Sequence, residues 1–540
     1  MVECLLCKQN AVGSNPSTST NEGRRSLAPF PFSHLPPGRF FFLPLFIPAW
    51  GQTLQKEIEP MRKLMATLLA FGAILPLCVI GVDAQPKAVK AAWFRADISC
   101  DVGTTLAGYG NNDVSVEKID DLELNGLCID DGNDKVLIMS FDLIGLDNAA
   151  IRKIRKWAST SLGVKEANVL VSSTHTHGGP HTEMYRNAAK LNGSSYRIPD
   201  DPSHPDAKYP PFFDKVVSEA IHRFAQNPGW REVYVGFYSS SRDENRNRRF
   251  TTADNHASFI AHRRTLHKIA TGVADKELGT IALFDPQTYA PLFVLGNYAA
   301  HPLASHAPGK GGLRITSDFP GFYRRYIEAE TGAQAMFVMG ACGDLVPKGD
   351  ELGTRAARRV GENLAEASLA DIIDIQRNSQ RFMMSNPIVG GRIEKFEAKL
   401  RARWREVYER DAITLEVQCV SIGDVAFVGV PGEMTNELGL EIKWHSPYRR
   451  TFIAYCGTDY FGYISTANQV AAGGYEPQLQ KILARESLRL VTVSQNALFS
   501  LRSTLYPEDE KGEDGYPDNQ NLPLVNLPGG VKASKWRNKK

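Results

Sequence analysis

The chain has 540 residues, of which 43% are hydrophobic and 23% are charged, and its formal net charge is +2. This composition is ordinary for a soluble globular protein, and the length suffices for two or three domains or for one large α/β unit. The near-neutral charge and the lack of a basic stripe with interleaved aromatic residues argue against a nucleic-acid partner.

The first 84 residues are predicted to lie outside the fold. Residues 1–60 show neither helical nor strand periodicity, and we expect them to be a non-native extension. A basic Met-Arg-Lys at 61–63, an apolar stretch at 64–80 and small residues near Ala84 have the layout of a secretory signal peptide. We therefore expect cleavage near Ala84 and export to the periplasm or the extracellular space. A membrane anchor is the alternative, although the apolar run is short for crossing a bilayer.

A catalytic domain is predicted over 85–505, followed by a polar tail at 506–540. Strand 136–141, helix 148–161 with Asp147 as N-cap and strand 168–174 predict a βαβ unit with a parallel strand pair. Residues 186–211 are predicted to form a long loop that borders the site. Residues 303–316 are predicted to form either a mobile lid over the site or a plain surface loop. Further predicted helices lie at 212–226, 319–330, 353–371, 393–410, 436–444 and 477–503, and further strands at 414–421, 425–430 and 451–456. The charged stretch 395–410 is expected to be a solvated helix face.

Cysteine usage does not indicate a disulfide framework. After the expected cleavage, the number of cysteines is odd and no Cys-x-x-Cys pair remains. Cys342 is expected to be a small buried residue, as free cysteines often are. The cysteines of the expected mature chain are Cys100, Cys128, Cys342, Cys419 and Cys456.

A His-x-His pair, His175 and His177, follows the apolar run 169–173 and precedes Gly-Gly-Pro. On a strand, residues i and i+2 point to the same face, so the two imidazoles would lie side by side. Neutral imidazole is the commonest protein ligand for zinc. The alternative is a surface turn with two solvated histidines.

Three more apolar runs end in the same way, each presenting a polar side chain after small residues. They end at His301, Asp344 and Glu433. Continuous hydrophobicity is typical of strands buried on both faces, so we expect an α/β fold with a mixed, largely parallel sheet flanked by helices. Ligands bind at the carboxyl ends of such strands. A convergent set of His175, His301 and Glu433 with an open position would be typical of a catalytic zinc.

Six short motifs strengthen this interpretation because they occur in the order found in a known family. They lie at 173–177, 245–248, 301–302 with 317–318, 343–347, 431–435, and 463–466 with 475–476. With these motifs, the chain resembles the neutral, non-lysosomal ceramidase family over about residues 95 to 500. These are zinc amidases that cleave the N-acyl bond of ceramide. The resemblance implies a Zn²⁺ ion held by His175, His301, Glu433 and the phenolate of Tyr463, a tyrosine that chemistry alone would not single out.

The resemblance also implies that His177, Arg248 and Tyr475 surround the scissile amide. His177 can accept and donate a proton near neutral pH, or else it orients His175. Arg248 and Tyr475 are candidates for stabilising the oxyanion. Four arginines crowd together at 242, 246, 248 and 249, and most are expected to be solvated. Asp318 and Asp344 are expected to have structural roles.

One departure from the family pattern concerns a serine implicated in catalysis, which Val346 replaces. Either zinc-activated water makes that serine dispensable, or the substrate differs, or the chain is a binding-only relative. A zinc esterase or another amidase would use the same ligands. Too few residues follow 505 for the C-terminal β-sandwich of animal and bacterial members, so we expect it to be missing. The expected partner is a small-molecule or lipid substrate, with transient membrane-surface contact and no protein partner implied.

Overall fold

The computed structural model describes residues 85–109, 114–190, 196–252, 257–258, 268–305, 313–349 and 352–507. The expected signal peptide at 61–84 and most of the expected tail at 506–540 lie outside these residues. Of the helices in the described ranges, none is both long enough and apolar enough to cross a bilayer.

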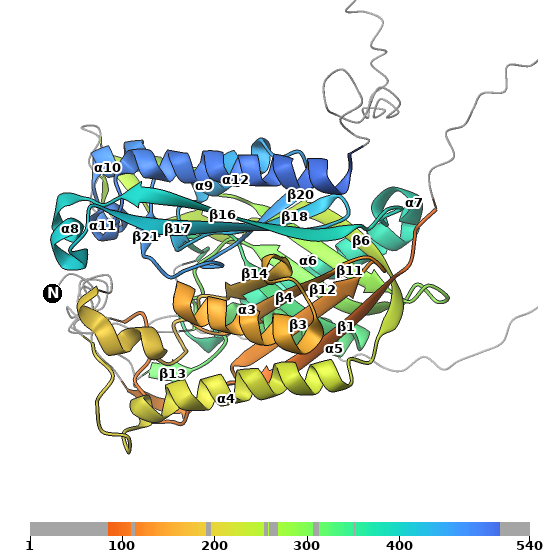
Figure 1. Cartoon of the computed structure of the whole chain (residues 1–540), viewed down its shortest axis with the longest axis horizontal. Coiled ribbons are helices and arrows are strands. Elements are labelled where there is room, and N and C mark those ends of the chain that lie inside the picture. Colours follow the sequence, from red (N-terminus) through yellow and green to blue (C-terminus); the bar gives the residue numbers. More distant parts are fainter. Residues whose placement is uncertain are drawn as a thin grey trace, which may run out of the picture. The chain divides into compact units, whose positions relative to one another are not determined.

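Two β-sheets form the framework of the described chain, and they pack face to face (Figure 1). In spatial order, the larger sheet consists of β14 (Gln334–Met339), β12 (Pro291–Tyr298), β11 (Glu277–Phe284), β6 (Arg231–Ser241), β1 (Val89–Asp97), β3 (Glu123–Asp130), β4 (Lys135–Phe141) and β5 (Val169–Ser173). The smaller sheet consists of β16 (Val389–Lys399), β17 (Ala412–Ile422), β18 (Val425–Gly429) and β20 (Arg450–Ala454). Because the inner face of each sheet meets the other sheet and helices cover the outer faces, most strands are continuously apolar.

Helices cover the outer face of each sheet. On the larger sheet, α3 (Asn148–Leu162) and α4 (Pro205–Gln226) cover the half that ends in β5, and α5 (Asp318–Thr331) and α6 (Thr354–Arg377) cover the half that ends in β14. On the smaller sheet, α9 (Asn436–Trp444) and α12 (Ala484–Leu505) pack on the outer face. The order is therefore helices, sheet, sheet, helices, with α12 and α4 on opposite sides in Figure 1.

The expected mixed α/β architecture is confirmed. Parallel pairing joins β4 to β5, β12 to β14 and β18 to β20. The central strands β11, β6, β1 and β3 are antiparallel to their neighbours, so parallel pairing has a smaller share of the sheet than expected. Apolar runs of this kind indicate that a strand is buried on both faces, but they do not indicate whether it is parallel or antiparallel to its neighbours.

The predicted βαβ unit is confirmed as β4, α3 and β5. The side chain of Asp147 accepts a hydrogen bond from the backbone N–H of Ala150 at 3.0 Å, which caps the first turn of α3. Gly163 ends the helix with a φ of 68°, a left-handed conformation that favours glycine. The cap by Asp147 was predicted from the sequence.

The predicted helix at 393–410 is wrong. Residues Val389–Lys399 form β16, which pairs with β17 along its whole length, and only α8 (Ala402–Tyr408) is helical. β16 is an edge strand whose buried Phe396 and Ala398 alternate with exposed charged residues. Charged side chains are common on edge strands because they prevent pairing with other chains, and here they concealed the strand pattern.

The predicted helix at 212–226 begins earlier, at Pro205, and the predicted span 477–503 divides into α11 (Tyr475–Leu479) and α12. The remaining elements are short. They are β2 (Ser115–Lys118), β7 (Asn245–Asn247), β8 (Phe250–Thr252), β9 (Ala257–Ser258), β10 (Lys268–Thr271), β13 (Leu313–Ile315), β15 (Leu345–Pro347), β19 (Glu433–Met434), β21 (Tyr463–Ile464), α7 (Ser379–Phe382), α10 (Ala467–Ala472), and the 3₁₀ helices η1 (Glu166–Asn168) and η2 (Glu183–Lys190).

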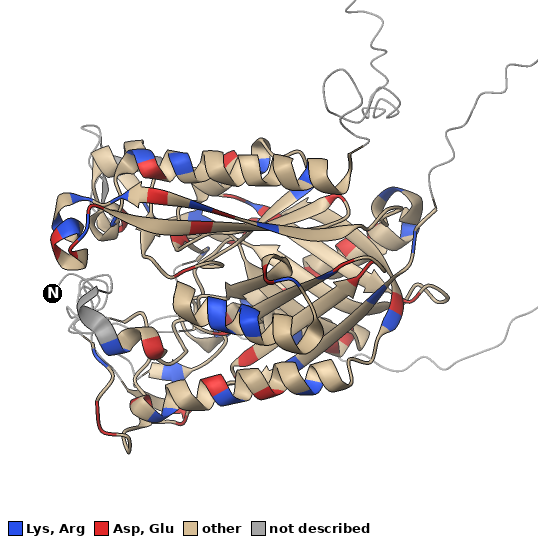
Figure 2. Ribbon diagram, viewed as in Figure 1, with Lys and Arg blue, Asp and Glu red and all other residues tan. Residues whose placement is uncertain are grey.

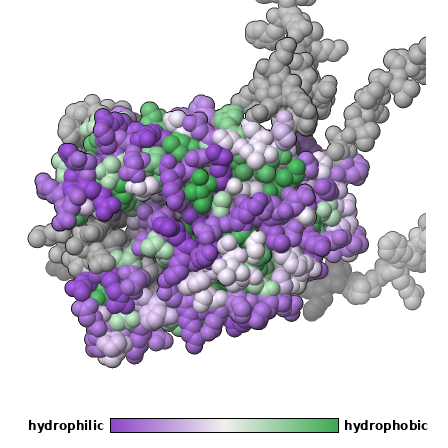
Figure 3. Space-filling model, viewed as in Figure 1, coloured by the Kyte–Doolittle hydropathy of each residue, from purple (hydrophilic) through white to green (hydrophobic). Residues whose placement is uncertain are grey.

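The visible face of the described chain carries residues of both charges and is mostly polar. Basic and acidic residues are both present along α4 and α12 in Figure 2. The face in Figure 3 is mostly hydrophilic, with hydrophobic side chains in small separate areas. The cysteines in the described ranges are free and buried, in agreement with the absence of a disulfide framework from the sequence pattern.

Candidate metal centre

His175 stands where β5 leaves the larger sheet. Pairing with β4 ends at Ser173, and the backbone N–H of His175 then bonds to the carbonyl of Leu143 at 2.9 Å. His175 has a φ of 64°, a left-handed conformation that costs about 1 kcal/mol for a residue with a side chain. The strand therefore ends before His175, so the two histidines are neighbours because of a turn and not because they share a strand face. Such local strain clusters at functional sites.

His301 follows β12 by three residues, and its position depends on the loop after β14. Its backbone N–H bonds to the carbonyl of Leu345 at 3.0 Å, and its Nδ1 lies 2.5 Å from the carbonyl oxygen of Cys342. The parallel pairing of β12 with β14 brings these two strand ends together.

Glu433 comes from the smaller sheet, in the segment after β18. Its backbone N–H bonds to the carbonyl of Gly462 at 2.9 Å, and β19 pairs with β21 so that Glu433 lies opposite Tyr463. Gly432 makes this close approach possible, because a Cβ at that position would lie 2.5 Å from the carbonyl oxygen of Gly462.

Three ligand-type atoms converge in this region. The Nε2 atoms of His175 and His301 each lie 3.5 Å from Oε2 of Glu433. All three atoms are buried, and none has a hydrogen-bond partner among the described residues. Buried polar atoms are normally paired, so an unpaired trio needs an explanation. Ligand atoms around a tetrahedral zinc are about 3.4 Å apart, given bonds of about 2.1 Å, so the spacing fits such an ion.

The other nitrogen of each histidine fixes its tautomer. Nδ1 of His175 lies 2.7 Å from the carbonyl oxygen of Ile144, and Nδ1 of His301 faces the carbonyl of Cys342. A carbonyl only accepts, so each Nδ1 carries the proton and donates it, and each Nε2 presents a lone pair. This arrangement is the usual one for metal-binding histidines.

Electrostatics favour the same protonation states. Burial, together with the nearby charge of Arg248, lowers the pKa of His301 to about 4, so the imidazole is neutral at pH 7. Burial would raise the pKa of Glu433, but the imidazoles of His175 and His301 outweigh burial and hold it well below its usual value. A neutral imidazole and an ionised carboxylate are the forms that bind metals.

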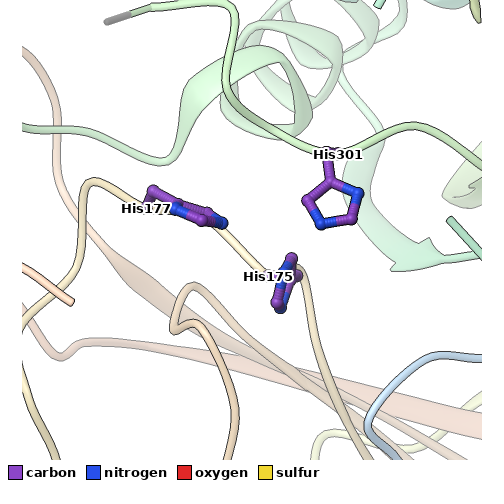
Figure 4. A group of neighbouring side chains, drawn as sticks. All are labelled: His175, His177 and His301. Atoms are coloured by element: carbon purple, nitrogen blue, oxygen red, sulfur yellow. The ribbon is translucent and has the colours of Figure 1, made fainter. Parts of the chain in front are cut away.

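His177 lies next to these ligands and is half-buried. Its ring centroid is 5.1 Å from that of His175 and 6.0 Å from that of His301 (Figure 4). The ligand-type nitrogens of the three histidines all lie within 4.8 Å of one another. On its other side, the ring packs against Tyr109 and Gly108, and a Cβ at Gly108 would lie 2.2 Å from Nδ1 of His177.

Arg248 connects Tyr463 to a buried carboxylate. Its Nη2 donates to the hydroxyl oxygen of Tyr463 at 3.0 Å and its Nε donates to Oε1 of Glu476 at 2.8 Å. Arg249 binds the other oxygen of Glu476 at 2.5 Å. Both guanidinium groups are buried, so the expectation that most of the four arginines are solvated is wrong; Glu476 forms an ion pair with each of the two.

Tyr463 lies opposite Glu433 and is buried. Burial and the charge of Glu433 raise the pKa of its hydroxyl well above the usual value, and Arg248 opposes that shift. Tyr475 is half-buried, with its ring 5.5 Å from that of Tyr463 and 5.6 Å from the guanidinium carbon of Arg248. The predicted residues His175, His177, His301, Glu433, Tyr463, Arg248 and Tyr475 are thus linked by contacts into one region.

Val346 also belongs to this region. It lies in β15, which pairs with β7, and it follows Leu345, whose carbonyl accepts the backbone N–H of His301. Its side chain is half-buried. The position at which the resemblance would place a serine therefore lies at the candidate site.

Asp344 and Asp318 have structural surroundings, as expected. Asp344 accepts hydrogen bonds from the backbone N–H of Asn436 at 2.8 Å and from the side chain of Asn247 at 2.8 Å. Asp318 accepts from the backbone N–H of Ser305 at 2.7 Å. The carboxylate of Asp344 therefore joins segments from distant parts of the chain, and that of Asp318 fixes the nearby loop at Ser305.

Sequence reasoning did not identify several residues that shape the site. Tyr455 and Tyr460 pack against the His175 ring, with centroids 5.1 and 6.1 Å away, and Glu476 had no assigned role. Tyr455 and Tyr460 lie near the end of an apolar run, so that position was their only sequence signal.

Comparisons with known proteins support the fold. No model of a known protein family matches the sequence, and no curated protein is measurably similar to it. Two solved structures are similar, the neutral ceramidase from Pseudomonas aeruginosa and a ceramidase complexed with C2. Each has a TM-score of 0.60 at 15% identity; the matches cover 78% of this chain and 75% and 76% of the other chains. The chain therefore has a ceramidase-like fold.

Proposed function

We propose that the chain is a zinc-dependent hydrolase that cleaves an N-acyl amide bond, in ceramide or a related N-acyl lipid, to release a fatty acid and an amine. The observation that supports this most directly is the convergence of His175, His301 and Glu433, whose buried donor atoms lack partners at the spacing of a tetrahedral ion. The ceramidase-like fold supports the choice of an amide as the substrate bond.

Zinc would be held by His175, His301, Glu433 and Tyr463. An ion at this position would lower the pKa of a water molecule and polarise a substrate carbonyl. The donor set fits zinc, since imidazole nitrogens and a carboxylate oxygen are its usual ligands. Tyr463 requires the loss of its proton, and the adjacent Arg248 guanidinium favours the phenolate form.

The other residues of the site would bind the substrate and move protons. Arg248 and Tyr475 would donate hydrogen bonds to the carbonyl oxygen as it gains negative charge. His177 would accept a proton from the attacking water and donate it to the leaving amine, because an imidazole can act as both base and acid.

Val346 favours water over a side chain as the attacking group. A valine can neither attack a carbonyl nor donate a hydrogen bond, so no hydroxyl is supplied from that position. A zinc esterase or a different amidase is the second candidate function, since Val346 changes the polarity of the wall that faces the substrate. Export after cleavage near Ala84 and transient contact with a membrane surface remain part of the proposal.

The test is metal analysis of the purified full chain, followed by hydrolysis assays. A panel of fluorogenic N-acyl amides and matched esters, with and without a zinc chelator, separates the candidates. We expect one bound zinc and chelator-sensitive amide cleavage. Faster cleavage of esters would indicate the esterase, and a zinc-loaded chain that cleaves neither would indicate a binding protein.

Glu433→Gln should abolish zinc retention, because the variant replaces an ionised ligand with a neutral amide. We expect the zinc affinity to fall by more than about 100-fold, the upper range seen even for residues that only orient ligands. Glu441→Gln, on the exposed side of α9, is the matched control. Full zinc content in Glu433→Gln, measured by plasma mass spectrometry, would refute the ligand assignment.

A further inference from the structure

A buried lysine that the proposed chemistry does not use lies near the ligands. The side chain of Lys481 is almost fully buried, and its Nζ lies over three aromatic rings. The ring centroids of Phe461, Trp404 and Tyr408 are 4.6, 5.4 and 5.6 Å away. Nζ also donates a hydrogen bond to the hydroxyl of Tyr408 at 3.1 Å. Aromatic faces attract a cation most strongly when water is excluded.

This amine is charged near neutral pH. Burial lowers the pKa of Lys481 to about 8, and the negative charges of Asp459 and Glu433 oppose a larger shift. A pKa of about 8 leaves about nine-tenths of the amine protonated at pH 7. The aromatic rings therefore surround an ammonium group.

Phe461 links this ammonium to the metal ligands. Its ring lies closest to Nζ, while its backbone N–H bonds to the carbonyl of Pro431 at 3.2 Å. The next residue, Gly462, accepts the backbone N–H of Glu433 at 2.9 Å, and the residue after that is Tyr463. In this segment, the ring of Phe461 thus contacts Lys481, and the backbone of residues 461–462 bonds to the segment that carries Glu433.

The beginning of the same segment is fixed independently. The hydroxyl of Thr458 donates to the carbonyl of Glu416 at 2.6 Å, and Asp459 accepts from the backbone N–H of Asn148 at 3.1 Å. Between these anchors and Tyr463 lie two rings: Tyr460 packs against His175, and Phe461 packs on Lys481 and on Tyr408.

We propose that Lys481 is a positioning residue of the metal centre. Its ammonium holds the ring of Phe461, and thereby the backbone that presents Tyr463 and hydrogen-bonds Glu433. This inference rests on the zinc site of the proposed function, but it is independent of the reaction and of the substrate. It assigns a role to a residue outside the proposed ligand set.

A second buried lysine provides a matched control. Lys443 in α9 donates to Asp275 at 2.8 Å and also pairs with Glu277. It stabilises the fold through ion pairs and is not packed on the segment that presents Tyr463. Replacing either lysine with methionine keeps the length of the side chain and removes its charge. Comparison of the two variants therefore distinguishes a positioning role from a general effect of losing a buried cation.

The experiment measures zinc affinity by competition with a chromophoric chelator, without any substrate. We expect Lys481→Met to bind zinc about tenfold more weakly than wild type, as is usual for residues that orient ligands, and Lys443→Met to bind it as wild type does. Zinc affinity in Lys481→Met equal to that of wild type would overturn the proposal. So would an equal loss in Lys443→Met.

A double-mutant cycle tests the route through Tyr463. If Lys481 acts by presenting Tyr463, then adding Lys481→Met to Tyr463→Phe should weaken zinc binding by much less than tenfold; full additivity would refute this route. Should Lys481→Met fail to fold, Phe461→Leu keeps the lysine and removes the ring, and it must also weaken zinc binding. A wild-type chain that binds no zinc would refute the proposed function together with this inference, whereas zinc binding without amide hydrolysis would leave this inference standing.

Discussion

At the scale of single residues, His181 is the clearest case in which burial determines chemistry. It lies four residues after His177, stacked on Tyr196 at 4.0 Å, and its Nδ1 donates to the carbonyl of Thr105 at 3.2 Å. Burial lowers the pKa of His181 to about 4, although the Thr105 bond and the charge of Asp206 oppose the shift. The folded chain therefore keeps this imidazole neutral where an unfolded chain would protonate it.

The consequence is a specific loss of stability in mild acid. The pKa in the folded state is below the unfolded value of about 6.5, so the unfolded chain binds more protons between about pH 6.5 and 4 and stability falls as the pH falls. Between pH 7 and pH 5, His181 should account for about 2 kcal/mol of that loss. His181→Gln should reduce the loss by this amount in urea unfolding.

The control for that experiment is His222→Gln, a change at an exposed position on α4. It should leave the difference between pH 7 and pH 5 as in wild type. An unchanged difference in His181→Gln would mean that the folded chain protonates this imidazole as readily as the unfolded chain does.

At the scale of elements, Arg155 joins α3 to the smaller sheet. Its guanidinium forms an ion pair with Glu416 and donates to Oε1 of Gln418 at 2.6 Å, both on β17, and its Nε donates to the carbonyl of Val169 at 3.2 Å. Arg155 is buried, as are Glu416 and Gln418. One side chain thus connects a helix on the outer face of the larger sheet to a strand of the other sheet.

Arg155→Met should destabilise the fold by about 3 kcal/mol, because it leaves the carboxylate of Glu416 buried and without its main partner. Adding Glu416→Met should restore part of this loss, since two apolar side chains can replace a buried ion pair. Arg152→Met, exposed on the same helix, should change the unfolding free energy by less than about 0.5 kcal/mol. Equal stability of the variants at 152 and 155 in urea unfolding would contradict the structural role of Arg155.

The same scale shows how far the sequence determines the fold. Apolar runs and cap residues identified β4, α3, β5, β12, β14 and β18, because burial on two faces and helix capping depend on local sequence. The strand β16 was missed because its register with β17 places charged residues at a sheet edge. The convergence of His175, His301 and Glu433 was predictable because each follows such a run, whereas Tyr463 was indicated only by the family resemblance. The pairing of Arg248 and Arg249 with Glu476 was not, because more than 220 residues separate the partners and no local pattern reports the contact.

At the scale of the whole described region, the candidate metal centre lies where the two sheets meet. His175 and His301 follow strands of the larger sheet, whereas Glu433 and Tyr463 follow strands of the smaller one. A metal ion held by all four residues would connect the two sheets. Zinc binding should therefore stabilise the packing of one sheet on the other.

We expect zinc to raise the unfolding temperature and chelation to lower it. Zinc at 100 times its dissociation constant should add about 2.7 kcal/mol to the free energy of unfolding, provided that the unfolded chain does not bind it. Calorimetry with zinc and with a chelator measures the shift. Magnesium should have no such effect, since it prefers oxygen ligands. A shift that persists in Glu433→Gln would place the stabilising ion elsewhere.

The bare backbone of Gly108 has a consequence for how this chain can vary. A single methyl group there would push the imidazole of His177 aside. Gly108 therefore determines the orientation of the residue that we propose as the proton carrier, although it has no functional group itself. Gly108→Ala would remove no reactive side chain, but it would change the orientation of one of them, the imidazole of His177. An inventory of reactive side chains would therefore not reveal whether a homologous chain is active, and the residue facing this ring is the one to inspect.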